Sequence, residues 1–307
     1  MKLIDLHCDT LYKSVTQNMN LDNSSYETKL AKKGDNKLQC YAIWLPDDLD
    51  GDSAEKLFFT AAERLKSECI RCNINLMNSG RNLNTNFFTS ENNAFFTVEN
   101  GLALNGKLEN VKRFSELGVK IMTLTWNAHN YIGDGSTVKN PKGITPFGKQ
   151  AIKEMEKYGI VIDVSHASDA LFYDVSKLSQ KPFIATHSDS RTVTPHKRNL
   201  TDEQFKIIKE KKGLVGLNFH NAFLNSDPNK ASITDILRHA EHFLSLGGEN
   251  ILAIGSDFDG CSLPNDIKGS ESMSVLFELF LKHNYNESLV NKIFYENALK
   301  FFENFDI

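Results

Sequence analysis

The chain has 307 residues, a length at which one large α/β domain or two smaller domains can bury a core. Hydrophobic residues make up 40% of the sequence and charged residues 24%, values that are typical of a globular protein and exclude a disordered or fibrous chain. The formal net charge is −4, so the composition gives no sign of a basic surface for nucleic acid.

The cysteine count and the N-terminus bear on location. Five cysteines, an odd number in a long chain, do not form a disulfide framework and favour a reducing compartment. The first apolar stretch is interrupted at Asp5 and is too short for a signal peptide. Apolar runs elsewhere stay below the roughly 18–20 residues that a membrane-spanning helix needs. We therefore expect a cytoplasmic protein that does not interact with membranes.

Short apolar runs rich in β-branched and aromatic residues recur along the chain. They mostly lack polar alternation, which is the pattern of strands that are buried on both faces of a parallel sheet. In chain order, the predicted strands are Leu3–Leu6, Cys40–Leu45, Ala94–Val98, Val119–Thr125, Ile160–Val164, Phe183–Thr186, Leu214–Phe219 and Ile251–Gly255.

Amphipathic segments separate these runs. Some begin with capping residues, such as Ser168, or Thr201 followed by Glu203, and Gly118 and Gly159 stand where two of them would end. In chain order, the predicted helices are Ser53–Met77, Lys107–Leu117, Pro146–Tyr158, Ser168–Leu178, Thr201–Lys211, Ile233–Leu246, Ser272–His283 and Glu287–Phe302.

Alternation of strands and helices predicts an α/β fold. Eight strands and eight helices in turn favour a parallel (β/α)8 TIM barrel, formed by residues 1–307 as a single domain. The same alternation is also compatible with an open, doubly wound parallel sheet.

Side chains that can bind metals or carry protons follow the predicted strands. They are His7, Asp9, Glu99, His166, His187 and Asp257, which come from five separate segments. The carboxyl ends of all barrel strands lie on one face, where the active sites of such barrels are built. The sequence therefore predicts that these six side chains meet at one end of the barrel.

Each of these signals is weak on its own. His7 and Asp9, two positions apart on extended chain, can point the same way and bind one ion together, although a solvated turn is the commoner explanation of such a pair. Glu99 can cap a helix or bridge two cations. His166 and His187 can be buried histidines bonded to backbone, or neutral imidazoles that two consecutive strand–helix units present to one ion.

Four further carboxylates near the predicted metal ligands have candidate roles. Asp257 and Asp259 both follow the last strand, and Asp257, which is nearer the strand end, is the predicted proton carrier between a metal-bound water and a leaving amine. Asp163 and Asp189 could orient the two histidine rings as hydrogen-bond acceptors.

An ordered set of short stretches resembles the membrane (renal) dipeptidase family, peptidase family M19 of the metal-dependent amidohydrolase superfamily. The likeness covers almost the whole chain, and the ordered set is far more specific than any one stretch. The stretches are Asp5-Leu6-His7-Cys8-Asp9-Thr10, Val98-Glu99-Asn100-Gly101, Leu124-Thr125-Trp126-Asn127, Thr145-Pro146-Phe147-Gly148, Asp163-Val164-Ser165-His166, Thr186-His187-Ser188, Gly216-Leu217-Asn218-Phe219 and Ile254-Gly255-Ser256-Asp257-Phe258-Asp259-Gly260.

The resemblance implies a barrel that holds two zinc ions. His7, Asp9 and Glu99 would hold one ion, Glu99 would be shared, and His166 and His187 would complete the other set. It also implies hydrolysis of the peptide bond by a metal-bridging hydroxide. Asp257 would pass the proton to the departing amine.

For the substrate, the resemblance implies that Arg198 binds the terminal carboxylate, with Arg191 as the alternative. A guanidinium suits this role because it is permanently charged and bonds a carboxylate in two places. Two positions depart from the mammalian pattern. Trp126 stands where those members have a histidine that polarises the scissile carbonyl, so His129 is a candidate replacement, and His220 stands where they have tyrosine.

The family further implies small dipeptides as substrates, tolerance of a D-residue at the C-terminal position, and homodimerisation, which is common among its members. Two alternatives remain open at this point. One is another amidohydrolase activity on the same barrel, on a cyclic amide, a lactam or an ester. The other is a barrel that binds metal or peptide without turnover, which the departures at Trp126 and His220 keep open.

Overall fold

The computed structural model describes residues 1–78, 80 and 83–305. Its strands pair in parallel in the order β6-β5-β4-β2-β1-β8-β7, and the short β3 pairs with β4. Their bounds are β1 (Lys2–Cys8), β2 (Asn36–Trp44), β3 (Asn75–Leu76), β4 (Asn92–Glu99), β5 (Val119–Thr123), β6 (Val161–Asp163), β7 (Val215–Leu217) and β8 (Leu252–Ile254).

The sheet closes through the segment between β6 and β7. Within residues 183–186, Ile184 forms a parallel bridge to Asp163 and Ala185 forms one to Val215. This segment is the sixth predicted strand, reduced to isolated bridges. The predicted (β/α)8 barrel is therefore confirmed.

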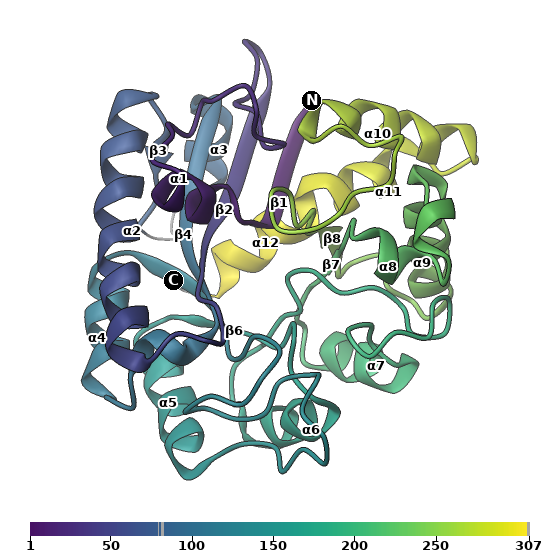
Figure 1. Ribbon diagram of the computed structural model, residues 1–307. Coiled ribbons are helices and arrows are strands. Elements are labelled where there is room, and N and C mark those ends of the chain that lie inside the picture. The colour runs from purple at the N-terminus through teal and green to yellow at the C-terminus, as the bar shows by residue number, and fades with distance from the viewer. Residues whose placement is uncertain (79, 81–82, 306–307) are drawn as a thin grey trace.

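Helices surround the strands on the outside (Figure 1). The first helices are α1 (Thr10–Thr16), α2 (Gly51–Arg71), α3 (Leu83–Thr89), α4 (Glu109–Glu116), α5 (Pro146–Lys157), α6 (Asp169–Leu178) and α7 (Asp202–Glu210). They are followed by α8 (Asn221–Leu224), α9 (Ile233–Ser245), α10 (Met273–Lys282), α11 (Glu287–Asn291), a π-helical turn η4 (Lys292–Glu296) and α12 (Asn297–Asn304), with 3-10 turns η1 (Gly101–Leu104), η2 (Pro228–Lys230) and η3 (Ser270–Ser272).

One predicted helix extends too far, and three helices are absent from the prediction. The helix expected over Ser53–Met77 ends at Arg71, because Asn73 adopts a left-handed backbone with φ 53° and residues 75–76 pair with β4 instead. The short helices α1, α3 and α8 have too few turns for their periodicity to stand out in the sequence.

Two layers of apolar side chains hold the barrel together. The larger layer lies between the strands and the surrounding helices. The second consists of inward side chains such as Ile4, Cys40 and Phe95 and continues into Phe87 of α3 and Phe302 of α12. The rings of Phe95 and Phe302 lie 5.0 Å apart, edge to face. These two helices therefore fill one end of the barrel, and the carboxyl ends of the strands form the open end.

In the described part of the chain, no helix combines the length and apolar character needed to cross a membrane. All five cysteines are free. The single-domain organisation over residues 1–307 stays a prediction.

Candidate active site

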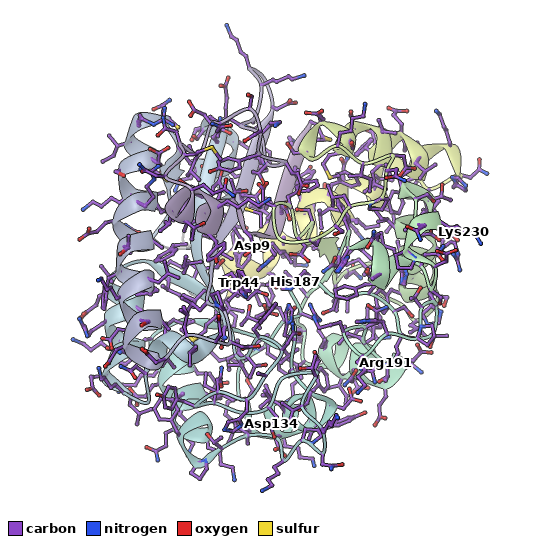
Figure 2. The ribbon with its side chains drawn as sticks, in the orientation of Figure 1. Asp9, Trp44, Asp134, His187, Arg191 and Lys230 are labelled. Atoms are coloured by element: carbon purple, nitrogen blue, oxygen red, sulfur yellow. The ribbon has the colours of Figure 1, made fainter. Side chains whose placement is uncertain are left out.

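Side chains at the carboxyl ends of the strands surround a cavity of about 360 Å³. In Figure 2, Asp9, Trp44 and His187 lie near the middle of the molecule, whereas Asp134 and Arg191 lie further out. The cavity is lined by Asp9, Tyr12, Lys13, Thr16, Gln17, Trp44, Glu99, Trp126, Asn127, His166, His220, Phe223, Asp257, Asp259 and Gly260.

The two ends of the chain meet at this cavity. The backbone amide of Asp9 donates to the carbonyl of Phe258 at 2.9 Å, and the amide of Asp257 donates to the carbonyl of His7 at 3.1 Å. Gly260 packs so closely that a Cβ there would lie 1.9 Å from Oδ2 of Asp9. A residue with a side chain at position 260 would therefore collide with the carboxylate of Asp9, and glycine is needed there for Asp9 and Asp257 to lie this close.

Glu99, at the end of β4, lies between the histidines. Its Oε2 is 3.6 Å from Nε2 of His7, and its Oε1 is 2.9 Å from Nε2 of His166 and 3.6 Å from Nε2 of His187. Asp9 Oδ2 is 3.4 Å from Nε2 of His7. Each oxygen of Glu99 therefore faces a different group of nitrogens, as a carboxylate shared by two cations would.

A hydrogen-bond chain fixes the tautomer of His187. Thr186 Oγ1 donates to the carboxylate of Asp163 at 2.6 Å and lies 2.8 Å from Nδ1 of His187. Because its proton is directed to Asp163, the hydroxyl accepts from His187, and Nδ1 carries the ring proton. Asp163 thus acts on His187 through Thr186, whereas Asp189 accepts from the backbone amide of Asn218.

The ring of His166 is fixed in the same way. Its Nδ1 lies 3.0 Å from Oδ1 of Asn127, an acceptor, so that Nδ1 is protonated. The two Nε2 atoms of His166 and His187 then face each other as lone pairs at 3.1 Å, beside Glu99. Nε2 of His7 and Oδ1 of Asp9 are buried without a hydrogen-bond partner. Facing lone pairs and buried polar atoms without a partner fit a site for cations.

The pKa values of the histidines and of Glu99 reflect the charges that they place on one another. Burial opposes a charge on His7, but Glu99 and Asp9 outweigh it and raise the pKa of His7 well above its usual value. Burial likewise opposes ionisation of Glu99, yet His7 and the other two imidazoles lower the pKa of Glu99 well below its usual value. Burial lowers the pKa of His166 to about 4 and lowers that of His187 well below its usual value. His166 and His187 are therefore neutral beside the ionised Glu99, as metal ligands must be, whereas His7 holds a proton that a bound cation would displace.

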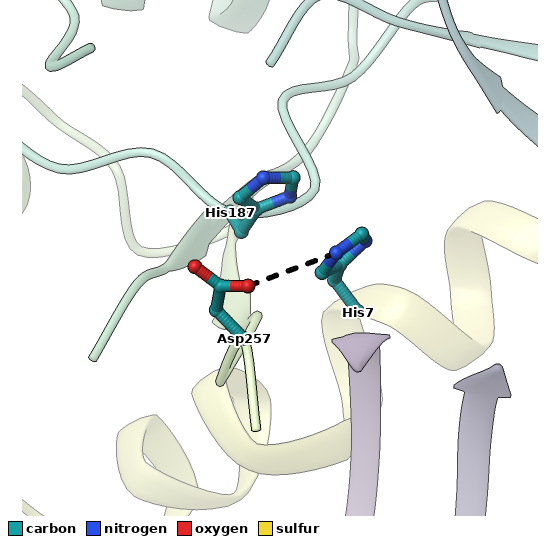
Figure 3. A group of neighbouring side chains, drawn as sticks. All are labelled: His7, His187 and Asp257. Carbon is teal, nitrogen blue, oxygen red and sulfur yellow. Dashed lines mark ion pairs between the residues drawn. The ribbon is translucent and has the colours of Figure 1, made fainter. Parts of the chain in front are cut away.

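Asp257 lies on the cavity side of this group. Its Oδ1 is 3.8 Å from Nε2 of His7 (Figure 3), and its Oδ2 accepts from Nδ2 of Asn218 at 3.1 Å. Burial raises the pKa of Asp257 to about 8. Asp259 instead accepts from Thr10 at 2.6 Å. The structure thus gives the two carboxylates after β8 different partners.

Three residues that line the cavity have a left-handed backbone. They are His166 (φ 67°), Asp257 (φ 63°) and Asp259 (φ 66°). This conformation is unfavourable for residues other than glycine and persists where the surrounding structure imposes it, commonly at functional sites.

Arg198 and Arg191 differ in their partners. Arg191 forms two hydrogen bonds to the carboxylate of Asp169, both at 2.9 Å. Arg198 is only 6% exposed, and among the described residues it forms no ion pair with a carboxylate. It donates to the carbonyl of His187 at 3.1 Å, and its Nε has no partner. A buried guanidinium without a counter-ion is unfavourable, so an anionic ligand would stabilise it.

The remaining predicted substrate residues lie in different places. Trp126 and His220 line the cavity, and Trp126 packs its edge on Trp44 with ring centres 4.8 Å apart. The side chain of His129 is 62% exposed, pairs with Asp134 at 2.7 Å and lines a different cavity. The structure therefore does not bring His129 to the site.

Several residues of the site escaped the sequence analysis. Tyr12 and Lys13 belong to α1, which was not predicted, and Phe223 belongs to α8. Asn127 and Thr186 stand next to Trp126 and His187 in two of the stretches that carry the family resemblance, but the sequence assigned them no role.

A parallel barrel with buried histidines and carboxylates at the carboxyl ends of its strands is the arrangement of a metal-dependent barrel hydrolase. The profile of one family, described as membrane dipeptidase (peptidase family M19), matches residues 1–306. The chain belongs to this family, which places it among the metallo-dipeptidases. The resemblance seen in the sequence is confirmed.

Individual proteins are also similar to this chain. A Klebsiella pneumoniae protein described as "Uncharacterized protein in pqqA 5'region" is 32% identical over 216 residues, which cover 67% of this chain and 80% of that protein. Dipeptidase 3 of Macaca fascicularis is 26% identical over 95% of this chain and 61% of its own length. A solved structure described as dipeptidase AC, a metallopeptidase of family M19, has a TM-score of 0.90 at 25% identity and covers 99% of this chain and 98% of its own.

The hydroxyl of Thr186 is predicted to support metal binding through His187. Thr186→Val removes the acceptor for Nδ1 of His187 and leaves the volume nearly unchanged, so the affinity of the His187 cluster for an added divalent cation, with Zn²⁺ as the probe, should fall about 10–100-fold. Thr186→Ser retains a hydroxyl and should keep the affinity of the unchanged chain for the same probe. Competition with a chromophoric chelator measures both. Equal zinc affinity of the valine and serine variants would contradict the role of the hydroxyl.

Proposed function

We propose that this chain is a zinc-dependent dipeptidase that hydrolyses the peptide bond of dipeptides and accepts a D-residue at the C-terminal position. The main support is the position of Arg198, a buried cation without a carboxylate partner among the described residues, close to the cluster of metal-capable side chains. A short peptide whose carboxylate binds Arg198 would place its only peptide bond near this cluster.

The proposed metal ligands form two sets that share Glu99. His7, Asp9 and Glu99 would hold one zinc ion, and Glu99, His166 and His187 would hold the other; within each set the candidate ligand atoms lie within 4.8 Å of one another. When bound, zinc supplies Lewis acidity, which polarises a carbonyl group and makes water a stronger acid.

The chain's own residues bind and orient the dipeptide. Arg198 would form a bidentate pair with the carboxylate. Trp44 and Trp126 form an aromatic part of the cavity wall, which would shield a bound dipeptide from water. Asp257, held by Asn218, would accept a proton from the attacking water at one carboxylate oxygen and transfer it to the departing amine.

The direct test is amine release from a panel of L,L- and L,D-dipeptides with the zinc-loaded protein and a chelated control. The proposal expects zinc-dependent cleavage of dipeptides and no cleavage of matching tripeptides. Two bound zinc ions without cleavage of any dipeptide would contradict it and would direct attention to lactam and ester substrates.

Arg198→Met should lower kcat/KM for dipeptides roughly 10²-fold or more, mainly through a higher KM, because the carboxylate loses its charged partner. The zinc content should not change, and the thermal unfolding temperature should not fall, because the substitution removes a buried charge without a counter-ion. Arg191→Met is the matched control, since Arg191 is paired with Asp169, and it should leave KM unchanged. Similar KM values for the two variants would rule out the assigned role.

Asp257→Asn should keep both zinc ions and lower kcat by roughly 10²-fold or more, because the amide cannot carry the proton. Metal analysis and steady-state rates on the same preparation check this. Near-normal turnover, or loss of a zinc ion, would show that Asp257 has another role.

The homodimer and the cytoplasmic location stay predictions.

A further inference from the structure

The one-turn helix α8 places Phe223 between the cavity and Arg198. Phe223 lines the cavity, whereas Arg198 does not. The guanidinium carbon of Arg198 lies over the ring of Phe223, 5.3 Å from its centre. A carboxylate that enters from the cavity and pairs with Arg198 therefore comes close to this ring.

Two imidazoles hold the ring of Phe223 in place. The ring centre of His220 lies 4.4 Å from that of Phe223, and the ring centre of His196 lies 4.6 Å away. His220 is also part of the cavity wall. The three rings together form a compact wall around the approach to Arg198.

The backbone of α8 is anchored to the loop that carries Arg198. Asn199, the next residue, donates from Nδ2 to the carbonyl of Phe223 at 2.9 Å. Thr194 Oγ1 donates to the carbonyl of Leu224 at 2.8 Å, and Nε2 of the buried His239 lies 3.0 Å from the same oxygen. The backbone of α8 is thus held in place relative to the loop that carries Arg198.

The position of Arg198 orients a bound dipeptide. With the carboxylate at Arg198, the C-terminal residue would lie against Phe223 and His220. The N-terminal residue would then point toward the remaining lining, which consists of the aromatic side chains Tyr12, Trp44 and Trp126 and of the polar side chains of α1.

We propose that Phe223 determines the specificity for the C-terminal residue, so that dipeptides ending in glycine or in L- or D-alanine are accepted and those ending in leucine or phenylalanine are excluded. This inference rests on the proposed dipeptidase function. Its physical basis is steric, since the Phe223 ring occupies space beside Arg198 that a large C-terminal side chain would need. Apolar pockets discriminate about tenfold or more for each added methylene.

The experiment separates binding from turnover. Two phosphinate mimics of dipeptides, which cannot be hydrolysed, are compared by calorimetry on zinc-loaded protein: one ends in D-alanine and the other in D-leucine. The wild type should bind the alanine mimic at least about tenfold more tightly. Phe223→Ala should reduce this preference to near one, chiefly through tighter binding of the leucine mimic. Phe223→Leu, which preserves more of the wall, should give an intermediate ratio.

Phe147→Ala is the matched control, because Phe147 lines the other cavity, with Tyr131 and His129. It should keep the wild-type ratio. The same proteins are then assayed with the corresponding dipeptides, and kcat/KM should follow the binding ratios.

The possible results separate the role of Phe223 from the proposed dipeptidase function. An unchanged ratio in Phe223→Ala would overturn the role of Phe223 while leaving the dipeptidase function intact. A ratio that collapses in Phe223→Ala, with no cleavage of any dipeptide by the wild type, would support Phe223 and refute the proposed function. Failure of both mimics to bind the wild type would overturn both.

Discussion

Glu99 is the residue on which the candidate site depends. Its carboxylate is buried, and its two oxygens face imidazoles that come from the ends of different strands, His7 on one side and His166 and His187 on the other. A buried negative charge surrounded by lone pairs is stable only with positive charge close by. The raised pKa of His7 and the lowered pKa of Glu99 are two expressions of this requirement. Closure of the barrel matters because it brings these strand ends within a few ångströms of one another.

The sequence predicts the barrel better than it predicts the segments added to it. Long runs of buried, β-branched residues identify the strands even where the structure forms few backbone pairs, as at residues 183–186. Short helices are different, because one or two turns do not establish a period, and α8 has only four residues. The end of α2 had a usable signal, Asn73, since asparagine tolerates the left-handed conformation that ends a helix.

The candidate site was likewise predicted in part. Titratable residues after strands could be placed at one end of the barrel because the fold itself brings strand ends together, and the structure unites His7, Asp9, Glu99, His166, His187 and Asp257 there. The direction of each side chain could not be predicted. Asp257 and Asp259 differ in their partners, Asn218 and Thr10. The contrast between Arg198 and Arg191 likewise depends on which of them finds a carboxylate partner. His129 follows Trp126 closely in sequence, yet its pairing with Asp134 keeps it away from the site.

The apolar filling of the other end of the barrel has a consequence for the order of events. Inward side chains such as Phe95, together with Phe87 of α3 and Phe302 of α12, form a continuous apolar layer in the described residues, directly below the polar site. Ions, water, substrate and products would then all enter and leave through the cavity. They would have to do so one after another. Metal would have to load before substrate, and a bound dipeptide would trap the ions beneath it until both amino acids had left.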